Sequence, residues 1–232
     1  MTPEALLAGR SAPLRLVIFD CDGVIADSEG IANRIMARVV TELGWPIAPG
    51  DADRLFLGMT LAAVTPIVEA KIGRKLAPGW ADHVRDEFIT ALGRELEPIP
   101  GALAALDGVD ALGLPWRIAS NSTHEEMRVK FARIGILDRV RGRMHSHRDV
   151  AAGKPAPDLF LATAAAQGVS PGECVVIEDS TTGARAAAAA GMDCLGYAPH
   201  GSAAALRAVG AVTFQSMFDL AHLIALAPRE AA

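Results

Sequence analysis

The chain has 232 residues, of which 51% are hydrophobic and 21% are charged, and its formal net charge at pH 7 is −5. This composition excludes intrinsic disorder, and the acidic balance argues against nucleic acid or an anionic membrane surface as a partner. Three scattered cysteines and the lack of a long apolar run predict no disulfide framework, no structural zinc site and no membrane span. We therefore expect a cytoplasmic protein with one large domain, with or without an insert.

Short apolar runs predict strands that are buried in a sheet, at residues 14–20, 115–119, 174–177, 192–197 and 212–215. Helical patterns lie between them, at residues 101–112, 123–134, 156–167 and 182–190. Because strands and helices of these lengths alternate, we expect an α/β protein with a doubly wound, Rossmann-like parallel sheet. His145 and His147 have no further metal-ligating residues nearby, so we interpret them as a surface segment or a strand edge.

Residues 29–97 interrupt this alternation, because they contain no convincing buried strand. Helical patterns occur instead at residues 31–43, 61–72 and 80–96. We predict a small helical cap at residues 29–97, inserted into an α/β core formed by residues 1–28 and 98–232. Ligands of open α/β sheets bind at the carboxyl ends of the strands, so an insert that leaves from that end would lie over the site as a lid.

Acidic residues stand at the ends of two predicted strands. Asp20 and Asp22 follow the first strand, and Glu178 and Asp179 follow the strand at residues 174–177. Carboxylate oxygens are the hard ligands that Mg²⁺ prefers. Each pair also has an ordinary interpretation, because acidic residues form turns and cap helices.

Hydroxyl, amide and ammonium groups stand at two further places. Ser120 and Asn121 follow a predicted strand and precede a helix, where such residues either bind phosphate or cap the helix. Lys154 lies between Gly153 and Pro155, and the proline would stiffen the turn that directs it, although a solvated lysine is the simpler interpretation. Four such clusters at the strand ends of one sheet are improbable as independent caps, so we expect them to form one site.

The segments FDCDGVIADSE, IASNS, GKPAPDLF and VIEDSTTGARAAAAAGM resemble the four ordered motifs of the haloacid dehalogenase superfamily. The helical insert between the first two motifs is similar to that of the small-cap subfamily, which includes sugar-phosphate phosphatases, β-phosphoglucomutases and phosphoglycolate phosphatases. The resemblance covers nearly the whole chain, and it is more specific for the superfamily than for the substrate. It implies a Mg²⁺-dependent phosphatase acting on a small phosphorylated metabolite, such as a sugar or sugar-acid phosphate.

The resemblance also implies roles for individual residues. Asp20 would be the nucleophile that forms an aspartyl-phosphate, and Asp22 would be the general acid and then the general base. Ser120, with backbone N–H groups around Asn121, would bind phosphate oxygens. Lys154 would balance charge in the transition state and hold Asp20 in line.

A magnesium ion is the cofactor that the resemblance implies. It would bind Asp20, the backbone carbonyl of Asp22 and Asp179, with Glu178 either as a ligand or directly behind the ligands. The cation would draw a dianionic phosphate toward a carboxylate that otherwise repels it. The presence of Asp22 favours phosphoryl transfer, because true dehalogenases lack this second acid.

Two alternative functions stay open. The β-phosphoglucomutases carry a histidine twelve residues after the nucleophile and a phosphate-gripping arginine further on, where this chain has Ala32 and Leu61, so we favour hydrolysis over a mutase reaction. A non-catalytic phosphate-binding module would predict a damaged catalytic set, yet the set is complete. The sequence does not distinguish a monomer from a homodimer.

Overall fold

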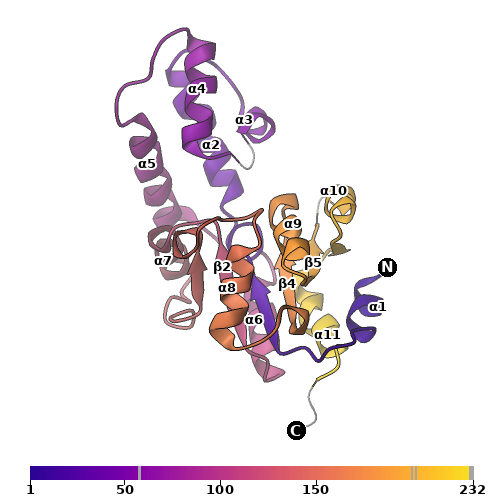
Figure 1. Ribbon diagram of the computed structural model, residues 1–232. Coiled ribbons are helices and arrows are strands. Elements are labelled where there is room, and N and C mark those ends of the chain that lie inside the picture. The colour runs from indigo at the N-terminus through magenta and orange to yellow at the C-terminus, as the bar shows by residue number, and fades with distance from the viewer. Residues whose placement is uncertain (57–58, 200, 202, 230–232) are drawn as a thin grey trace. The chain divides into compact units, whose positions relative to one another are not determined.

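The structure is a computed structural model that describes residues 1–56, 59–199, 201 and 203–229 (Figure 1). The chain divides into two compact units. One unit, the core, consists of Met1–Ala26 and Pro98–Ala232, and the other, the helical unit, consists of Asp27–Glu97.

A six-stranded sheet forms the centre of the core. Its strands are β1 (Leu16–Phe19), β2 (Trp116–Ser120), β3 (Met144–Ser146), β4 (Cys174–Glu178), β5 (Asp193–Tyr197) and β6 (Val212–Phe214). Their order is β3-β2-β1-β4-β5-β6, and every neighbouring pair is parallel. The chain therefore winds outward from β1 in both directions, which confirms the predicted doubly wound α/β fold.

Strand β3 was not predicted from the sequence. It has three residues and lies at the edge of the sheet, where it pairs only with β2. Met144 and His145 of this edge strand are only half-buried, so the strand does not need the continuous apolar sequence by which the central strands are recognised. His145 thus lies in an edge strand, as the sequence indicated, and His147 begins the 3-10 helix that follows it.

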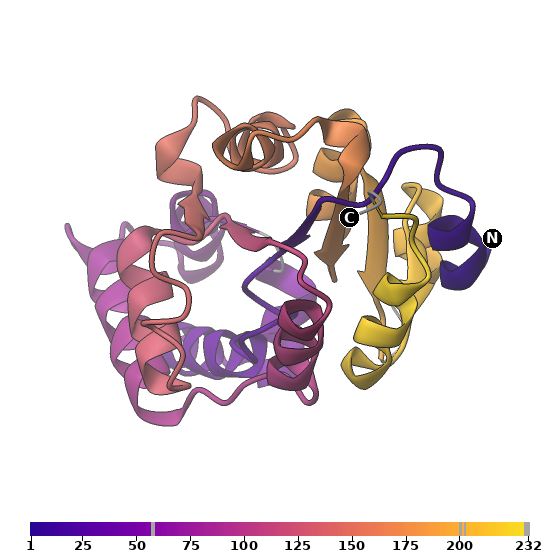
Figure 2. The same ribbon diagram turned by 90° about the horizontal axis from the view of Figure 1, so that it is seen from below.

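Helices of the core cover both faces of this sheet. They are α1 (Pro3–Ala8), α6 (Ala102–Ala111), α7 (His124–Arg133), α8 (Asp158–Gln167), α9 (Thr181–Ala189), α10 (Ala203–Ala208) and α11 (Leu220–Ala225), with 3-10 helices η1 (His147–Asp149), η2 (Pro171–Glu173) and η3 (Met217–Asp219). Helices α8 and α9 lie over one face, and α6 and α11 lie over the other (Figures 1 and 2).

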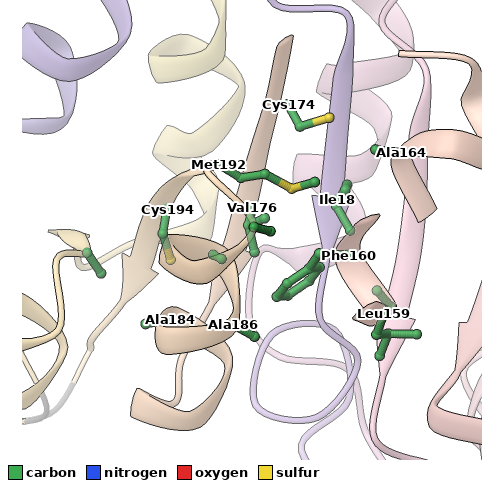
Figure 3. Packing of buried hydrophobic residues seen from close by; sticks show 14 of the residues in the cluster. Ile18, Leu159, Phe160, Ala164, Cys174, Val176, Ala184, Ala186, Met192 and Cys194 are labelled. Atoms are coloured by element: carbon green, nitrogen blue, oxygen red, sulfur yellow. The ribbon is translucent and has the colours of Figure 1, made fainter. Parts of the chain in front are cut away.

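Packing against α8 and α9 explains the alanine-rich composition of the chain. One face of the sheet contributes Ile18 and Val176 to a buried cluster that includes Phe160 of α8 and Ala184 and Ala186 of α9 (Figure 3). Small side chains let a helix approach a sheet closely, so few aromatic residues are needed to fill the space. The opposite face of β1 carries Phe19, which packs edge-on against Trp116 with the ring centroids 6.2 Å apart.

Chain segments that are distant in sequence meet at two places in the core. Helices α1 and α11 lie side by side (Figure 2), and the amide of Leu14 donates to the carbonyl of Pro228 at 2.8 Å. Where the helical unit is inserted, Ala26 forms an antiparallel bridge with Pro98, and the amide of Ile99 donates to the carbonyl of Ile25 at 2.9 Å. The two ends of the insertion are therefore joined by backbone hydrogen bonds.

The helical unit contains α2 (Glu29–Glu42), α3 (Pro49–Phe56), α4 (Leu61–Ile72) and α5 (Trp80–Glu95). The sequence predicted α2, α4 and α5 but not α3, because Pro49 and Gly50 resemble a helix breaker. Proline is well accommodated in the first turn of a helix, because the N–H groups of that turn have no acceptor within the helix and the missing N–H of proline removes no hydrogen bond. Phe56 of α3 packs edge-on against Trp45, with the ring centroids 5.7 Å apart.

The helical content of the chain bears on membrane insertion. Within the described residues, no single helix is long and apolar enough to cross a membrane. The sharply bent pair α3 and α4 reaches the required length and composition only when the two helices are taken together.

A polar network anchors α6 to the sheet. Trp116 Nε1 donates to Asp110 Oδ1 at 2.7 Å, and Arg139 donates to Asp110 Oδ2 at 2.7 Å. The guanidinium of Arg143 lies over the Trp116 ring, 4.4 Å from its centroid. Burial tends to raise the pKa of Asp110, but the hydrogen bonds from Arg139 and Trp116 outweigh it, and the pKa is lowered overall.

We predict that Asp110→Asn destabilises the protein at neutral pH but not in acid. The folded-state pKa of Asp110 lies below its unfolded value, so its stabilising contribution is present above the unfolded pKa and disappears as the pH falls through the folded one. Because water reaches this side chain, we expect a loss of about 1 kcal/mol or less at pH 7. Urea unfolding at several pH values measures the difference. Asp138→Asn, in an exposed ion pair with Arg141, is the matched control and should change little.

Candidate active site

The residues that the sequence singled out meet at the carboxyl edge of the sheet. In β1, Phe19 is in register with Ile118 of β2 and with Ile177 of β4. The next residue after Phe19 is Asp20, which therefore lies beside the ends of both neighbouring strands. Parallel pairing thus brings together side chains that are more than a hundred positions apart in the sequence.

A buried lysine joins Asp20, which follows β1, to Glu178 at the end of β4. Lys154 Nζ donates to Asp20 Oδ1 at 2.6 Å and to Glu178 Oε1 at 2.7 Å. All three side chains are buried, and the ammonium lies 4.7 Å from the centroid of the Phe160 ring. The simpler interpretation of Lys154 as a solvated loop residue is therefore wrong.

Burial and charge shift the titration of this group. The pKa of Asp20 is raised to about 7: burial is the main cause, the charge of Lys154 opposes it, and the charges of Glu178 and Asp22 add to it. Burial tends to lower the pKa of Lys154, but the two carboxylates that it contacts raise it above its ordinary value. The protein alone therefore holds more negative charge here than one lysine balances.

Glu178 is fixed more firmly than the other acids. Besides Lys154, it accepts hydrogen bonds at Oε2 from the amides of Asp179 and Ser180, at 3.1 and 3.0 Å, and from the Ser180 hydroxyl at 2.8 Å. Gly183 of α9 packs against this carboxylate so closely that a Cβ there would lie 1.6 Å from Glu178 Oε1. The fully buried Glu178 therefore has no room to move.

Asp22 has different partners from Asp20. Lys130 Nζ donates to Asp22 Oδ1 at 2.6 Å and to Oδ2 at 2.8 Å, and the Ser122 hydroxyl donates to Oδ2 at 2.8 Å. Lys130 is buried in α7; burial tends to lower its pKa, but the charge of Asp22 and the hydrogen bonds to it raise the pKa above its ordinary value. The two aspartates of the first cluster are thus each bound to a separate lysine.

Ser120 and Asn121 have structural partners within the site. The buried Ser120 hydroxyl accepts a hydrogen bond from the Ser122 amide at 3.0 Å and lies 3.5 Å from Asp22 Oδ2. The Asn121 side chain accepts from the Lys154 amide at 2.9 Å and donates to the Lys154 carbonyl at 3.0 Å. Asn121 therefore holds the backbone of the lysine loop with both atoms of its amide group.

Three acids lie close enough to share a cation. Asp20, Glu178 and Asp179 each offer a carboxylate oxygen, and these atoms lie within 4.8 Å of one another. Gly23, with a φ of +72°, passes so close to Asp179 that a Cβ would lie 1.9 Å from its Oδ2. A glycine is needed there for both the backbone conformation and the space. The side chain of Asp22 lies outside this group of three.

A comparison with protein families bears directly on this arrangement. The model of the haloacid dehalogenase-like hydrolases matches residues 14–191. The chain belongs to this family. The match spans all four motifs, so the family assignment made from the sequence is confirmed.

Individual relatives in this family are phosphatases. The chain is 32% identical over 181 residues to the 6-phosphogluconate phosphatase of Escherichia coli K12, covering 78% of this chain and 80% of the relative. It is 31% identical over 175 residues to hexitol phosphatase A of the same organism, covering 75% and 78%. A HAD family hydrolase from Deinococcus radiodurans R1, solved with bound phosphate and sodium, superposes with a TM-score of 0.77 at 30% identity, covering 92% of this chain and 98% of the other.

Sequence reasoning missed Lys130, and it assigned no role at the site to Ser122 or Ser180, although capping by Ser180 at the start of α9 was one of its interpretations. One signal for Lys130 was available: it lies three residues after Met127 and next to Phe131, which places it on the buried face of α7. A lysine on the apolar face of a helix requires a buried partner. No signal in the sequence identified the partner, because Asp22 lies 108 positions away.

We predict that Gly183→Ala disrupts the site from within helix α9. The new methyl group would overlap the Glu178 carboxylate, which its hydrogen bonds hold in place, so we expect a loss of about 1–3 kcal/mol in stability. Gly30→Ala is the matched control: that helical glycine has open space around it, and the change should be neutral or slightly stabilising. Chemical denaturation of both variants measures the difference, and equal behaviour would contradict the prediction.

Proposed function

We propose that the chain is a Mg²⁺-dependent phosphatase that hydrolyses a small phosphorylated sugar or sugar acid through an aspartyl-phosphate on Asp20. Membership of a hydrolase family with phosphatase relatives supports the reaction class. The observation that carries the proposal is the contact of buried Asp20 with Lys154, beside a cluster of acids that can hold a cation.

The residues present fit a magnesium ion. Asp20, Glu178 and Asp179 supply hard oxygen donors in a small space, and Lys154 alone leaves an excess of negative charge. Glu178 already accepts four hydrogen bonds, so it serves partly to order the other two acids. When bound, Mg²⁺ supplies the positive charge that lets a phosphate dianion approach a carboxylate.

The remaining chemistry belongs to side chains of this chain. Asp20 attacks phosphorus as the bond from phosphorus to the alcohol oxygen breaks, and Asp22 donates a proton to that leaving oxygen. Asp22 then takes a proton from water as the water attacks phosphorus, which releases inorganic phosphate and restores Asp20. Lys154 keeps Asp20 oriented, and Ser120 with backbone N–H groups near Asn121 binds phosphate oxygens.

The substrate class rests on the relatives and not on the core residues. The 6-phosphogluconate and hexitol phosphatases act on phosphates of small sugar derivatives, as their names state. The core residues discussed above already have proposed roles toward the cation, the phosphoryl group and proton transfer, so we propose that other residues select the sugar part of the substrate. A cytoplasmic location stays a prediction from the sequence.

Hydrolysis is favoured over a phosphomutase reaction by two positions in the helical unit. Ala32 in α2 and Leu61 at the start of α4 carry no group able to transfer a proton or bind phosphate. A mutase must hold a second phosphate on its intermediate, which requires additional cationic or hydrogen-bonding side chains. Water is therefore the acceptor that we propose.

We predict that the wild-type protein releases inorganic phosphate from sugar and sugar-acid phosphates only when Mg²⁺ is present. A panel of 6-phosphogluconate, hexose and hexitol phosphates and phosphoglycolate, with Mg²⁺ or with EDTA, measures this. Asp20→Asn should lower turnover by roughly 10³-fold or more, because the attacking oxygen is lost. Mass spectrometry after a rapid acid quench should detect a phosphorylated Asp20 in the wild type alone.

Three outcomes would contradict this proposal. Conversion between phosphate isomers that is faster than phosphate release would identify a phosphomutase. Binding of phosphate without turnover, or near-normal turnover by Asp20→Asn, would remove Asp20 from the role of nucleophile.

A further prediction concerns the binding of the cation without substrate. Mg²⁺ should raise the melting temperature of the wild type, because it binds the folded state in preference to the unfolded one. Asp179→Asn should lose most of this shift, because it removes one of the three carboxylates. Asp138→Asn, which removes an exposed carboxylate elsewhere, should keep it. Thermal unfolding with Mg²⁺ or EDTA measures the shifts, and an unchanged shift in Asp179→Asn would place the cation elsewhere.

A further inference from the structure

Lys130 is a deeply buried lysine of the site, and the proposed chemistry assigns it no role. Its side chain is only 1% exposed, on the inner face of α7 between Met127 and Phe131. An ammonium group has three hydrogen-bond donors, and all three are used: two on Asp22 and one on the Ser122 hydroxyl at 2.7 Å. Burying such a charge is costly unless every donor is satisfied, so this geometry is tightly defined.

The contact fixes the orientation of the Asp22 carboxylate. Both of its oxygens accept from Lys130, and Oδ2 also accepts from Ser122, so rotation of the carboxylate would break several hydrogen bonds. Ser122 is itself held, because its carbonyl accepts from the buried Ser146 hydroxyl at 2.7 Å. The orientation of Asp22 is thus determined by α7 and by the edge strand β3.

Exposure separates the functions of the two partners. The Asp22 side chain is 32% exposed and can reach a ligand, whereas Lys130 is buried behind it. Lys130 therefore influences a reaction through the side chains that it contacts, Asp22 and Ser122, and not by touching a ligand itself. In contrast, Lys154 contacts Asp20 and Glu178, so the nucleophile and the proton-transfer group have separate cationic supports.

We propose that Lys130, together with Ser122, is a positioning residue that aims Asp22 at the leaving oxygen and later at the attacking water. This inference rests on the proposed function. It implies that Lys130 governs the steps that need proton transfer by Asp22, while substrate binding and the attack by Asp20 depend on it little.

The test compares leaving groups in Lys130→Met, which keeps the length of the side chain and removes the ammonium. With the best sugar phosphate, single-turnover release of the sugar should fall about 10²-fold, as expected for a misplaced catalytic group, while KM changes little. With 2,4-dinitrophenyl phosphate, whose leaving group needs no proton, the initial burst of dinitrophenolate should stay near the wild-type rate. The later steady-state rate should fall, because Asp22 must still activate water.

Three further variants exclude a general structural effect. Arg128→Met removes a charge from the exposed face of the same helix and should match the wild type with both substrates. Ser122→Ala should show the same dependence on the leaving group with a smaller loss, which tests the inference even if Lys130→Met is unstable. In an Asp22→Asn background, Lys130→Met should cause almost no additional loss, because Lys130 acts through Asp22.

The outcomes separate this inference from the proposed function. Equal losses with both substrates, a normal rate with the sugar phosphate, or independent losses in the Asp22→Asn background would each overturn the role of Lys130. If the wild type and Arg128→Met hydrolyse no phosphate ester at all, the proposed function itself fails. If the wild type is active and Asp20→Asn is not, the proposed function stands whatever Lys130→Met does.

Discussion

The organisation of the core depends on the compensation of acidic side chains that are buried at strand ends. Parallel pairing of β1 and β4 brings Asp20 and Glu178 together. Both carboxylates are buried, so water does not screen the repulsion between their charges. Lys154 offsets this repulsion, and it is held in place because Asn121 binds the backbone of its loop and its ammonium lies over the Phe160 ring. Removing one partner of such a buried group leaves an uncompensated charge, which costs about 3–5 kcal/mol in comparable proteins.

A second lysine repeats this solution nearby with a different acid. Lys130 binds Asp22, so the site contains two cation–carboxylate groups whose members do not overlap. Because of this separation, the orientations of Asp20 and Asp22 do not depend on one shared lysine. Membership of the haloacid dehalogenase-like hydrolase family explains the reaction class, and the pairing of lysines explains how this chain orients its own residues.

Sequence patterns predicted the central fold because buried strands are continuous apolar runs, as in Val17 and Ile18 of β1. They did not predict β3, whose half-buried residues carry no such run, or α3, whose Pro49 resembles a breaker. Asp20 and Lys154 could be placed in one site because they follow strand ends or stiff turns. The contact of Lys130 with Asp22 could not, because a pairing between a helix and a distant loop is set by tertiary packing.

The place where the helical unit joins the core has a consequence for the engineering of this chain. The bridge between Ala26 and Pro98 and the hydrogen bond from the Ile99 amide to the Ile25 carbonyl hold the entry and exit of the insertion together on the core side. At the ends of the insertion itself, the amide of Asp27 donates to the carbonyl of Glu97 at 3.0 Å. Closing a gap between ends that already touch costs little conformational entropy. The helical unit can thus be replaced by another insert, or shortened to a turn, while the core keeps its own backbone connections at this point.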